Sequence, residues 1–321
     1  MKENYYSTEQ LLMFYRKMVL IREFEERVKF LFLEGTMPGT IHQYQGQEAC
    51  AVGVCSALKK GDIITTTHRP HGHCIAMGMD IKSMMAELFG KVTGCCRGKG
   101  GSMHMGDIEK GVVPGIAIVG GGIPIATGIG FGFKMKNMPN VAVCFMGDGA
   151  TNEGTFHESL NMASVWNLPV IYVVENNLYG ASTHVSLVMK VEKISERASA
   201  YRIPGITIDG NDVIKVYETA MEAVEKARSG GGPTLIELLT YRITGHSRRD
   251  PAAYQPPEEK KKALENEPIK KFTSFLLSRG VSKEIIESIR EEVKIEIEEA
   301  VKYAMESEYP LPEDTLNDLF A

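Results

Sequence analysis

Residues 141–154 have the sequence VAVCFMGDGATNEG, an unbroken apolar run followed by a glycine-rich turn. A short apolar run of this kind predicts a strand that is buried on both faces, as in a parallel sheet. Gly147 and Gly149 allow a tight turn and a close approach of the backbone to a ligand. Asp148 would then lie at the carboxyl end of a strand, where open α/β sheets bind their ligands.

A second apolar run at 170–174 is followed by the sequence ENNLYG at 175–180. The two motifs are separated by 26 residues, enough for a helix and a returning strand, so Asp148 and Asn177 should meet at one edge of the sheet. A carboxylate and an amide oxygen suit Mg2+ or Ca2+, and Mg2+ prefers few protein oxygens together with the phosphates of a ligand. Either motif alone is explained by ordinary turn chemistry. Together, each after a strand, they indicate a cation site.

The chain divides into three segments that differ in composition and periodicity, and we predict the boundaries 1–40, 41–255 and 256–321. The first has helical periodicity, the second is Gly-rich and alternates apolar strands with helical patterns, and the third is rich in Glu and Lys. We therefore predict an α/β protein whose mostly parallel sheet is covered by helices on both faces, with helical N- and C-terminal extensions. The apolar positions at helical spacing in the last segment are Ile285, Ile286, Ile289, Val293, Ile297, Val301 and Ala304.

The composition is that of an ordinary globular protein, with 43% hydrophobic and 24% charged residues. A net charge of -5 gives no reason to expect nucleic acid binding. No apolar run approaches the roughly 20 residues that span a bilayer, and the amino terminus lacks the apolar segment of a signal peptide. We predict a cytoplasmic protein that does not bind membranes. The six cysteines show no CxxC spacing, which predicts reduced, mostly buried thiols and argues against zinc.

The two motifs resemble the thiamine diphosphate (ThDP) motif. From roughly residue 10 to residue 310, the chain resembles the alpha subunit of the thiamine-dependent first component of 2-oxo acid dehydrogenase complexes. The resemblance implies the ThDP-binding fold, with ThDP and Mg2+ as cofactors. It implies that Asp148, Asn177 and the carbonyl oxygen of Tyr179 bind Mg2+, and that Gly149 and Ala150 lie against the cofactor.

The histidine-rich segments resemble the same family. His42, in HQYQGQEA, looks like the family's substrate-pocket histidine. In THRPHGH, Arg69 is similar to the arginine that holds the diphosphate, a task that suits its fixed fork of donors. His71 matches an active-site histidine, and His68 takes a cofactor-binding place that is tyrosine in the pyruvate members. The resemblance leaves His73 open between an active-site role and a structural one.

Three further segments match the family. AIVGGGIP, which begins at Ala117, resembles the segment whose backbone meets the aminopyrimidine, and Val119 would be the apolar wedge that bends ThDP; a plain core valine is the alternative. YRITGHSRRDP resembles the mobile loop over the cofactor, with His246 on the diphosphate. The serine that matches Ser247 is phosphorylated in some members. KGGSMH, which begins at Lys99, resembles a loop near the cofactor entrance.

The resemblance implies an enzyme that breaks a C–C bond next to a carbonyl and passes the acyl group to a lipoyl-bearing acyltransferase. His42, His71 and His246 would be its catalytic residues. ThDP activation needs a glutamate on a separate pyrimidine-binding module, and this chain shows a single α/β module. We therefore predict a beta subunit that supplies it, in an α2β2 heterotetramer. Similarity to bacterial acetoin dehydrogenase alpha subunits favours acetoin as the small-molecule substrate. Pyruvate, branched-chain 2-oxo acids, a nonredox ThDP lyase and a noncatalytic subunit remain alternatives.

Overall fold

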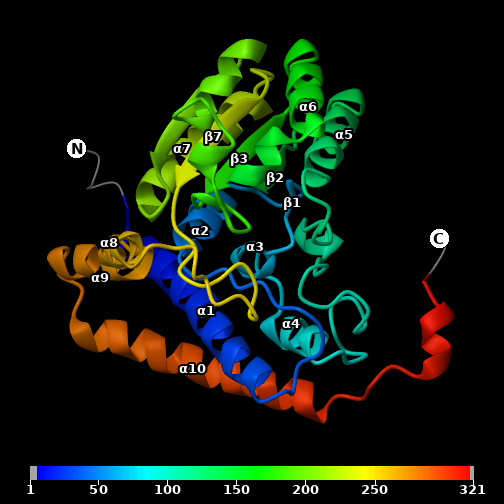
Figure 1. Cartoon of the computed structure of the whole chain (residues 1–321), viewed down its shortest axis with the longest axis vertical. Coiled ribbons are helices and arrows are strands. Elements are labelled where there is room, and N and C mark those ends of the chain that lie inside the picture. Colours follow the sequence, from blue (N-terminus) through cyan, green and yellow to red (C-terminus); the bar gives the residue numbers. More distant parts are fainter. Residues whose placement is uncertain (1–5, 319–321) are drawn as a thin grey trace.

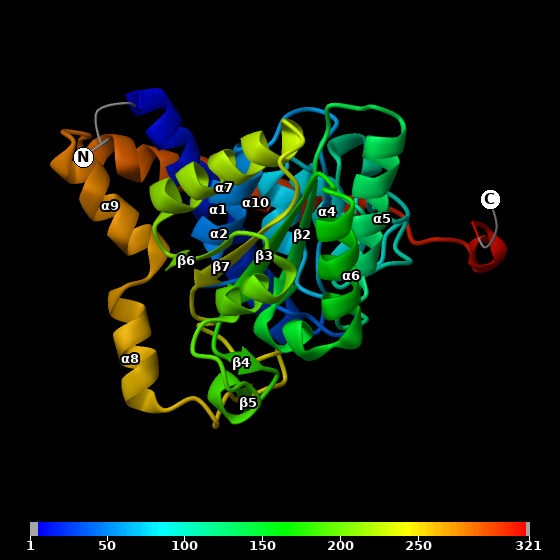
Figure 2. The same cartoon turned by 90° about the horizontal axis from the view of Figure 1, so that it is seen from above.

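A five-stranded parallel sheet forms the centre of the computed structural model, which describes residues 6–318 (Figures 1 and 2). Its strand order is β1-β2-β3-β7-β6, and all four neighbouring pairs are parallel. The strands are β1 (Ile63–Thr65), β2 (Ala142–Gly147), β3 (Val170–Asn176), β7 (Thr234–Leu239) and β6 (Gly205–Asp209). The predicted α/β class is confirmed, and the two apolar runs predicted as strands form β2 and β3.

Helices cover both faces of the sheet. Helices α5 (Gly122–Met135) and α6 (Gly154–Val165) pack on one face. Helix α7 (Val213–Arg228) packs on the other face, and α2 (Glu48–Ser56) packs against α7. Alternate residues of β2 therefore enter different cores, because side chains of a strand point to opposite faces in turn. Val143 and Phe145 join the core that contains α7, and Cys144 joins the core of α5 and α6.

The two terminal segments form a helical layer beside the sheet (Figure 1). Helix α1 (Thr8–Leu33) begins after Ser7, whose side chain caps it, and packs against α10 (Lys283–Glu306). The remaining helices of this layer and its surroundings are α3 (His71–Ala76), α4 (Ile81–Leu88), α8 (Pro257–Glu265) and α9 (Pro268–Ser278). Ile285 was expected on the buried stripe of α10 but is 44% exposed, because the stripe begins at the next residue, Ile286.

One continuous hydrophobic core joins α1, the face of the sheet that α7 covers, and α10. The proposed division at residues 40 and 255 therefore stays a prediction. Within residues 6–318, no helix is long and apolar enough to cross a membrane. All six cysteines are free thiols, and only Cys95 and Cys96 are partly exposed, as the lack of paired spacing predicts.

Short elements connect the sheet to its surroundings. Directly after β3, strands β4 (Tyr179–Gly180) and β5 (Thr183–His184) form a small antiparallel hairpin. The described 3-10 helices are η1 (Ile108–Lys110), η2 (Asp148–Asn152), η3 (Val185–Leu187), η4 (Ile194–Tyr201) and η5 (Pro312–Leu316). The turn that contains Asp148 is thus one of these 3-10 helices, and it begins where β2 ends.

Gly46 is a point of close backbone contact between distant segments. Its φ of +99° favours glycine, and an added Cβ atom would lie 2.2 Å from the carbonyl oxygen of Tyr241. We expect Gly46→Ala to lower the free energy of unfolding by about 3 kcal/mol, because backbone strain and a steric clash add. Urea denaturation measures this. Gly128→Ala is the control, since an added Cβ there meets nothing within 4 Å and α5 is helical. Equal midpoints for the two variants would contradict the prediction.

Candidate active site

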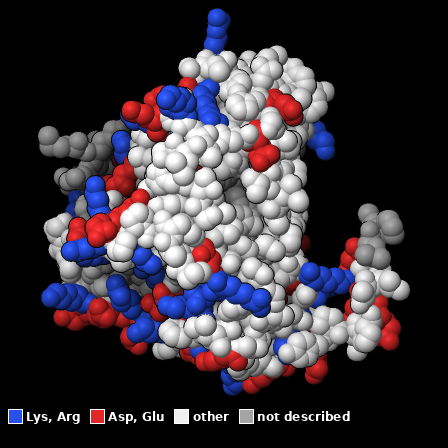
Figure 3. All heavy atoms as spheres, viewed as in Figure 1, with Lys and Arg blue, Asp and Glu red and all other residues white. Residues whose placement is uncertain are grey.

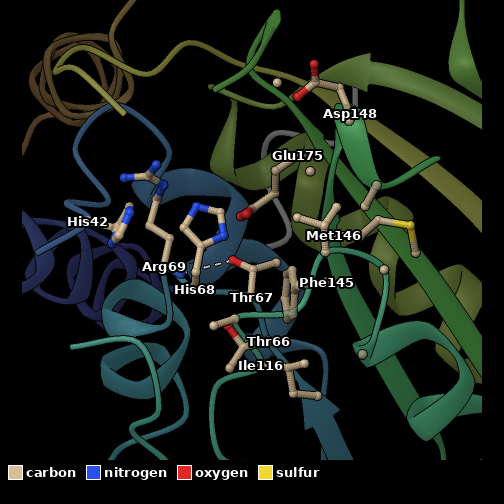
Figure 4. A pocket seen from close by; sticks show the side chains of 18 of the residues that line it. His42, Thr66, Thr67, His68, Arg69, Ile116, Phe145, Met146, Asp148 and Glu175 are labelled. Carbon is tan, nitrogen blue, oxygen red and sulfur yellow. Dashed lines mark hydrogen bonds between the residues drawn. The ribbon is translucent and has the colours of Figure 1, made fainter. Parts of the chain in front are cut away.

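A pocket of about 420 Å³ opens at the carboxyl ends of β2 and β3 (Figures 3 and 4). Strand pairing places Gly147 opposite Glu175, so the two motifs leave the sheet side by side. Eleven of the twelve predicted site residues line this pocket. They are His42, His68, Arg69, Ala117, Val119, Asp148, Gly149, Ala150, Asn177, Tyr179 and His246. The twelfth, His71, lies outside the lining.

Three oxygen atoms of the predicted cation site belong to this pocket. The side-chain nitrogen of Asn177 donates to Oε1 of Gln47 at 2.8 Å. Its Oδ1 accepts from the backbone N–H of Tyr179 at 3.3 Å and has a second lone pair for a cation. Burial raises the pKa of the Asp148 carboxyl to about 6, although nearby backbone N–H groups and Arg242 act in the opposite direction. A buried carboxylate, an amide oxygen and a carbonyl oxygen form a donor set that fits Mg2+.

Arg242 is a site residue to which the sequence analysis gave no role. Its buried guanidinium donates to the carbonyl oxygens of Tyr179 and Ala181, at 3.3 and 2.8 Å, and to the hydroxyl of Tyr254 at 2.7 Å. Leu178 and Ala181, which flank β4, have positive φ values of 73° and 52°. Arg242 thus fixes the backbone that presents the Tyr179 carbonyl. Its position soon after β7, at the same sheet edge as the two motifs, is the signal that could have identified it.

Three histidines and Arg69 form a basic cluster across the pocket from Asp148. The rings of His42, His68 and His246 lie 4.9 to 5.1 Å apart between centroids. Each ring has one buried nitrogen without a partner: Nδ1 of His42, Nε2 of His68 and Nδ1 of His246. Arg69 donates to the carbonyl oxygens of Gln43 and His246. Figure 4 shows His42, His68 and Arg69 together, with Asp148 on the opposite side. Unpartnered imidazole nitrogens beside a buried guanidinium fit the oxygens of a diphosphate.

His71 is held away from the pocket. It is fully buried, and its two ring nitrogens contact Oε1 of Glu25 and Oγ of Ser102, each at 3.0 Å. The next residue after Ser102, Met103, lines the pocket. His71 can therefore act on a ligand only through other residues, such as the segment that contains Ser102, and its catalytic role stays a prediction.

The wall of the pocket formed by residues 116–120 is apolar and open. Val119 is 56% exposed and its neighbour Ile118 is 75% exposed, although both line the pocket. This exposure excludes the alternative of a plain core valine. An exposed apolar side chain on this wall fits a wedge for a bent ligand, as the resemblance implies for Val119.

Comparison with known proteins identifies the family. Residues 16–313 match the family model of the dehydrogenase E1 component. The chain belongs to this family. It is 49% identical to the alpha subunit of acetoin:2,6-dichlorophenolindophenol oxidoreductase of Bacillus subtilis, over 97% of this chain and 94% of that protein. The corresponding subunit of Cupriavidus necator is 44% identical over the same shares of the two chains. The pyruvate dehydrogenase E1 component subunit alpha of Rhizobium meliloti is 42% identical over 98% of this chain and 90% of that protein.

Membership confirms the resemblance stated from the motifs. This E1 chain is the alpha subunit of a ThDP-dependent oxidoreductase, and its relatives, named as alpha subunits, imply a beta-subunit partner. Mg2+, the individual site residues, the substrate and the acyl acceptor are not fixed by membership. Of these, Mg2+ and the individual site residues rest on the geometry of the pocket.

The histidine cluster predicts acid sensitivity of the cofactor-free E1 chain. Burial, followed by the charge of Arg69, lowers the pKa of His42 to about 3, of His68 to about 2 and of His246 to about 4. In the unfolded chain these groups titrate near pH 6.5, so only the unfolded state takes up protons between that pH and about 4. The contribution of these histidines to the free energy of unfolding is therefore fully present above pH 6.5. It is lost as the pH falls further, by about 1 kcal/mol for each histidine at pH 5 after solvent screening.

Urea unfolding at pH 7.5 and pH 5 tests this prediction. The loss of stability between the two pH values should be smaller in His68→Asn, which removes one titrating group. Saturating ThDP with Mg2+ should also reduce the loss, because a diphosphate beside the rings favours their charged forms. An unchanged loss in the variant would contradict the assignment of the acid sensitivity to this cluster.

Proposed function

We propose that this E1 chain is the alpha subunit of an acetoin dehydrogenase. Together with a beta subunit it would bind ThDP through Mg2+, cleave acetoin between its carbonyl and carbinol carbons, and pass the acetyl group to a lipoyl-bearing acyltransferase. The observation that carries the cofactor assignment is the arrangement of one pocket: Asp148 and Asn177 lie on one side, and Arg69 with three histidines lies on the other. The two relatives named for acetoin support the substrate.

Each wall of the pocket has a distinct task in this proposal. Asp148, Oδ1 of Asn177 and the Tyr179 carbonyl would hold Mg2+. Arg69 and His246 would bind the diphosphate, with His68 and the backbone of Gly149 and Ala150 beside it. The backbone at Ala117 would meet the aminopyrimidine, and Val119 would support the bend between the two rings. When bound, ThDP supplies the thiazolium ring that makes C–C cleavage next to a carbonyl possible.

His42 is the pocket histidine that suits the substrate. Because its pKa is lowered to about 3, chiefly by burial, it is neutral near pH 7. A neutral imidazole can donate a hydrogen bond to a carbonyl oxygen without adding a charge to the pocket. His71 would hold the segment of Ser102 and Met103 against the ligand, as described above.

A substrate comparison tests the proposal. The chain, coexpressed with its beta subunit, is assayed on acetoin, pyruvate and branched-chain 2-oxo acids with 2,6-dichlorophenolindophenol as electron acceptor. We expect kcat/KM for acetoin to exceed the others by at least about 10-fold. A preference for pyruvate or a branched 2-oxo acid would overturn the substrate. A second assay adds a lipoyl domain, and product release that is independent of any acceptor would instead indicate a nonredox lyase.

A further inference from the structure

Two adjacent cysteines, Cys95 and Cys96, have converging side chains in the turns that follow α4. Their sulfur atoms and a carboxylate oxygen of Glu87 all lie within 4.8 Å of one another. Among the six cysteines, all of which the structure describes, only these two are partly exposed. Adjacent side chains of a helix or a strand point apart, so two accessible thiols at this distance form a dithiol that can bind one ligand. The chemistry proposed for the pocket uses neither thiol.

Glu87 holds the backbone that presents the two thiols. Its carboxylate is 1% exposed, and Oε2 accepts from the backbone N–H groups of Cys96 and Gly98 at 2.8 and 2.9 Å. Oε1 accepts from those of Gly100 and Gly101, also at 2.8 and 2.9 Å. Four donors occupy the lone pairs of the carboxylate, so Glu87 anchors the turn and is not a free metal ligand. The thiols are therefore held together before a ligand arrives.

The two thiols also contact each other. A hydrogen bond between them lowers the pKa of Cys96 and raises the pKa of Cys95, so the Cys95 thiol is the donor. The sulfur of Cys96 lies 3.2 Å from the carbonyl oxygen of His104. The thiolate is the form of cysteine that binds soft ions, and the contact with Cys95 favours that form at Cys96.

A disulfide between these two residues is disfavoured by geometry. The Cα atoms of adjacent residues are about 3.8 Å apart across a trans peptide bond, whereas disulfides prefer roughly 4.4–6.8 Å. The pair is therefore expected to remain a dithiol. A larger atom between the two sulfurs removes the restriction, because two bonds to that atom span a wider gap than one S–S bond.

The surroundings of the dithiol restrict the ligand that it can take. A structural zinc ion needs four ligands, and among the described residues no further histidine, cysteine or carboxylate joins the cluster. A monovalent soft ion such as Cu(I) would form a dithiolate with a net negative charge next to the carboxylate of Glu87, which repulsion disfavours. A monosubstituted trivalent arsenic compound, R–As=O, avoids both problems because it needs two sulfur ligands and gives a neutral product.

The reaction of this compound with the dithiol is balanced without an oxidant. Two As–S bonds form, while the As=O bond and the two S–H bonds break. The oxygen leaves as water with both thiol protons, and arsenic stays trivalent.

The turn that contains the dithiol leads directly to the pocket. Met103 lines the pocket and precedes His104, whose carbonyl oxygen contacts the sulfur of Cys96. The carbonyl oxygen of Met103 packs on Gly115, where an added Cβ atom would lie 2.5 Å from it, and the apolar wall at 116–120 follows. A ligand that draws the sulfur of Cys96 away from His104 would therefore disturb both Met103 and this wall.

We propose that Cys95 and Cys96 form a binding site for monosubstituted trivalent arsenicals, and that a bound arsenical weakens the binding of ThDP in the pocket. The site itself depends only on the two thiols and on the turn that Glu87 anchors. Its effect on ThDP rests on the proposed function, since that function assigns the pocket to the cofactor.

The test of the site uses the coexpressed complex and phenylarsine oxide. Mass spectrometry of the alpha chain should show one added phenylarsenic group. Excess dithiothreitol should remove the group, but 2-mercaptoethanol at the same thiol concentration should not, because two linked bonds hold more tightly than one. We expect Cys95→Ser and Cys96→Ser each to bind the compound at least about 100-fold more weakly, since only one As–S bond remains. Serine keeps a hydroxyl in place of the thiol, so both variants should fold.

Calorimetric titration with ThDP and Mg2+ measures the effect on the pocket. One equivalent of phenylarsine oxide per alpha chain should weaken ThDP binding by about 10-fold in wild type, a magnitude typical of coupled sites. The same treatment should have no effect on Cys95→Ser.

Cys55→Ala is the matched control. It removes a buried thiol of α2, outside the turn, and should respond to phenylarsine oxide as wild type does. Undiminished binding of the compound to the alpha chain of both serine variants would overturn the proposed site. Equal ThDP affinity of treated and untreated wild type would overturn its effect on the pocket. Failure of the untreated complex to bind ThDP would refute the proposed function and the coupling with it, whereas the mass measurement would still decide the arsenical site.

Discussion

Asp148→Ala is expected to weaken Mg2+-dependent binding of ThDP by at least about 100-fold. The carboxylate is the only charged ligand in the predicted cation site, and loss of even an outer partner of a metal site typically costs 10- to 100-fold in affinity. Without it, the neutral oxygens of Asn177 and Tyr179 would have to hold a strongly hydrated cation. The diphosphate would then lie at the sheet edge without its bridging metal. Calorimetric titration of the complex with ThDP, with and without Mg2+, measures the effect.

Asp209→Ala is the control for this variant. Asp209 also ends a strand of the parallel sheet, β6, but its carboxylate pairs with Lys271 at 2.6 Å and does not line the pocket. We expect this variant to bind ThDP as tightly as wild type. If Asp148→Ala also bound ThDP at full affinity with the same Mg2+ dependence, the cation site would have to lie elsewhere. The assignment of the pocket to ThDP would then lose its main support.

The chain without a beta subunit is expected to show less than about 1% of the turnover of the complex. Asp148 and Glu175 are the only carboxylates among the described residues that line the pocket, and neither belongs to the apolar wall at 116–120. That wall is where the aminopyrimidine is expected, and no described glutamate lines the pocket there, since Glu153 packs against Gly120 but lies outside the lining. Cofactor activation would fail, because general acid–base catalysis requires a group within hydrogen-bond reach.

The surface next to that wall fits an interface with the missing partner. Ile118 and Val119 are more than half exposed, and α5 and α6 add exposed apolar side chains, among them Phe131 and Val165. Figure 3 shows few charged side chains over these two helices. Mixing the chain with a separately purified beta subunit should restore turnover together with a larger assembly in size-exclusion chromatography. Turnover by the isolated chain near that of the complex would refute the dependence on a partner.

Strands β2 and β3 and the meeting of the two motifs at one sheet edge were predictable because their signals are local. The apolar runs at 142–146 and 170–174 are long enough to identify buried strands, and the polar motifs follow them directly. The sequence did not reveal β1, which has three residues, or β6, whose residues are only partly buried or exposed. Such strands carry too few apolar residues for a periodic pattern and form because their neighbours in the sheet pair with them.

The sequence by itself determined the fold class, the family resemblance and the pair of motifs that meet at the sheet edge. Tertiary structure alone decided which distant polar groups share the pocket. His71 lies outside the lining because it pairs with Glu25 and Ser102. Arg242 and Glu175, to which the sequence analysis gave no role, do line the pocket. The physical reason is that a buried polar side chain must find partners, and those partners come from segments that only the folded chain brings together.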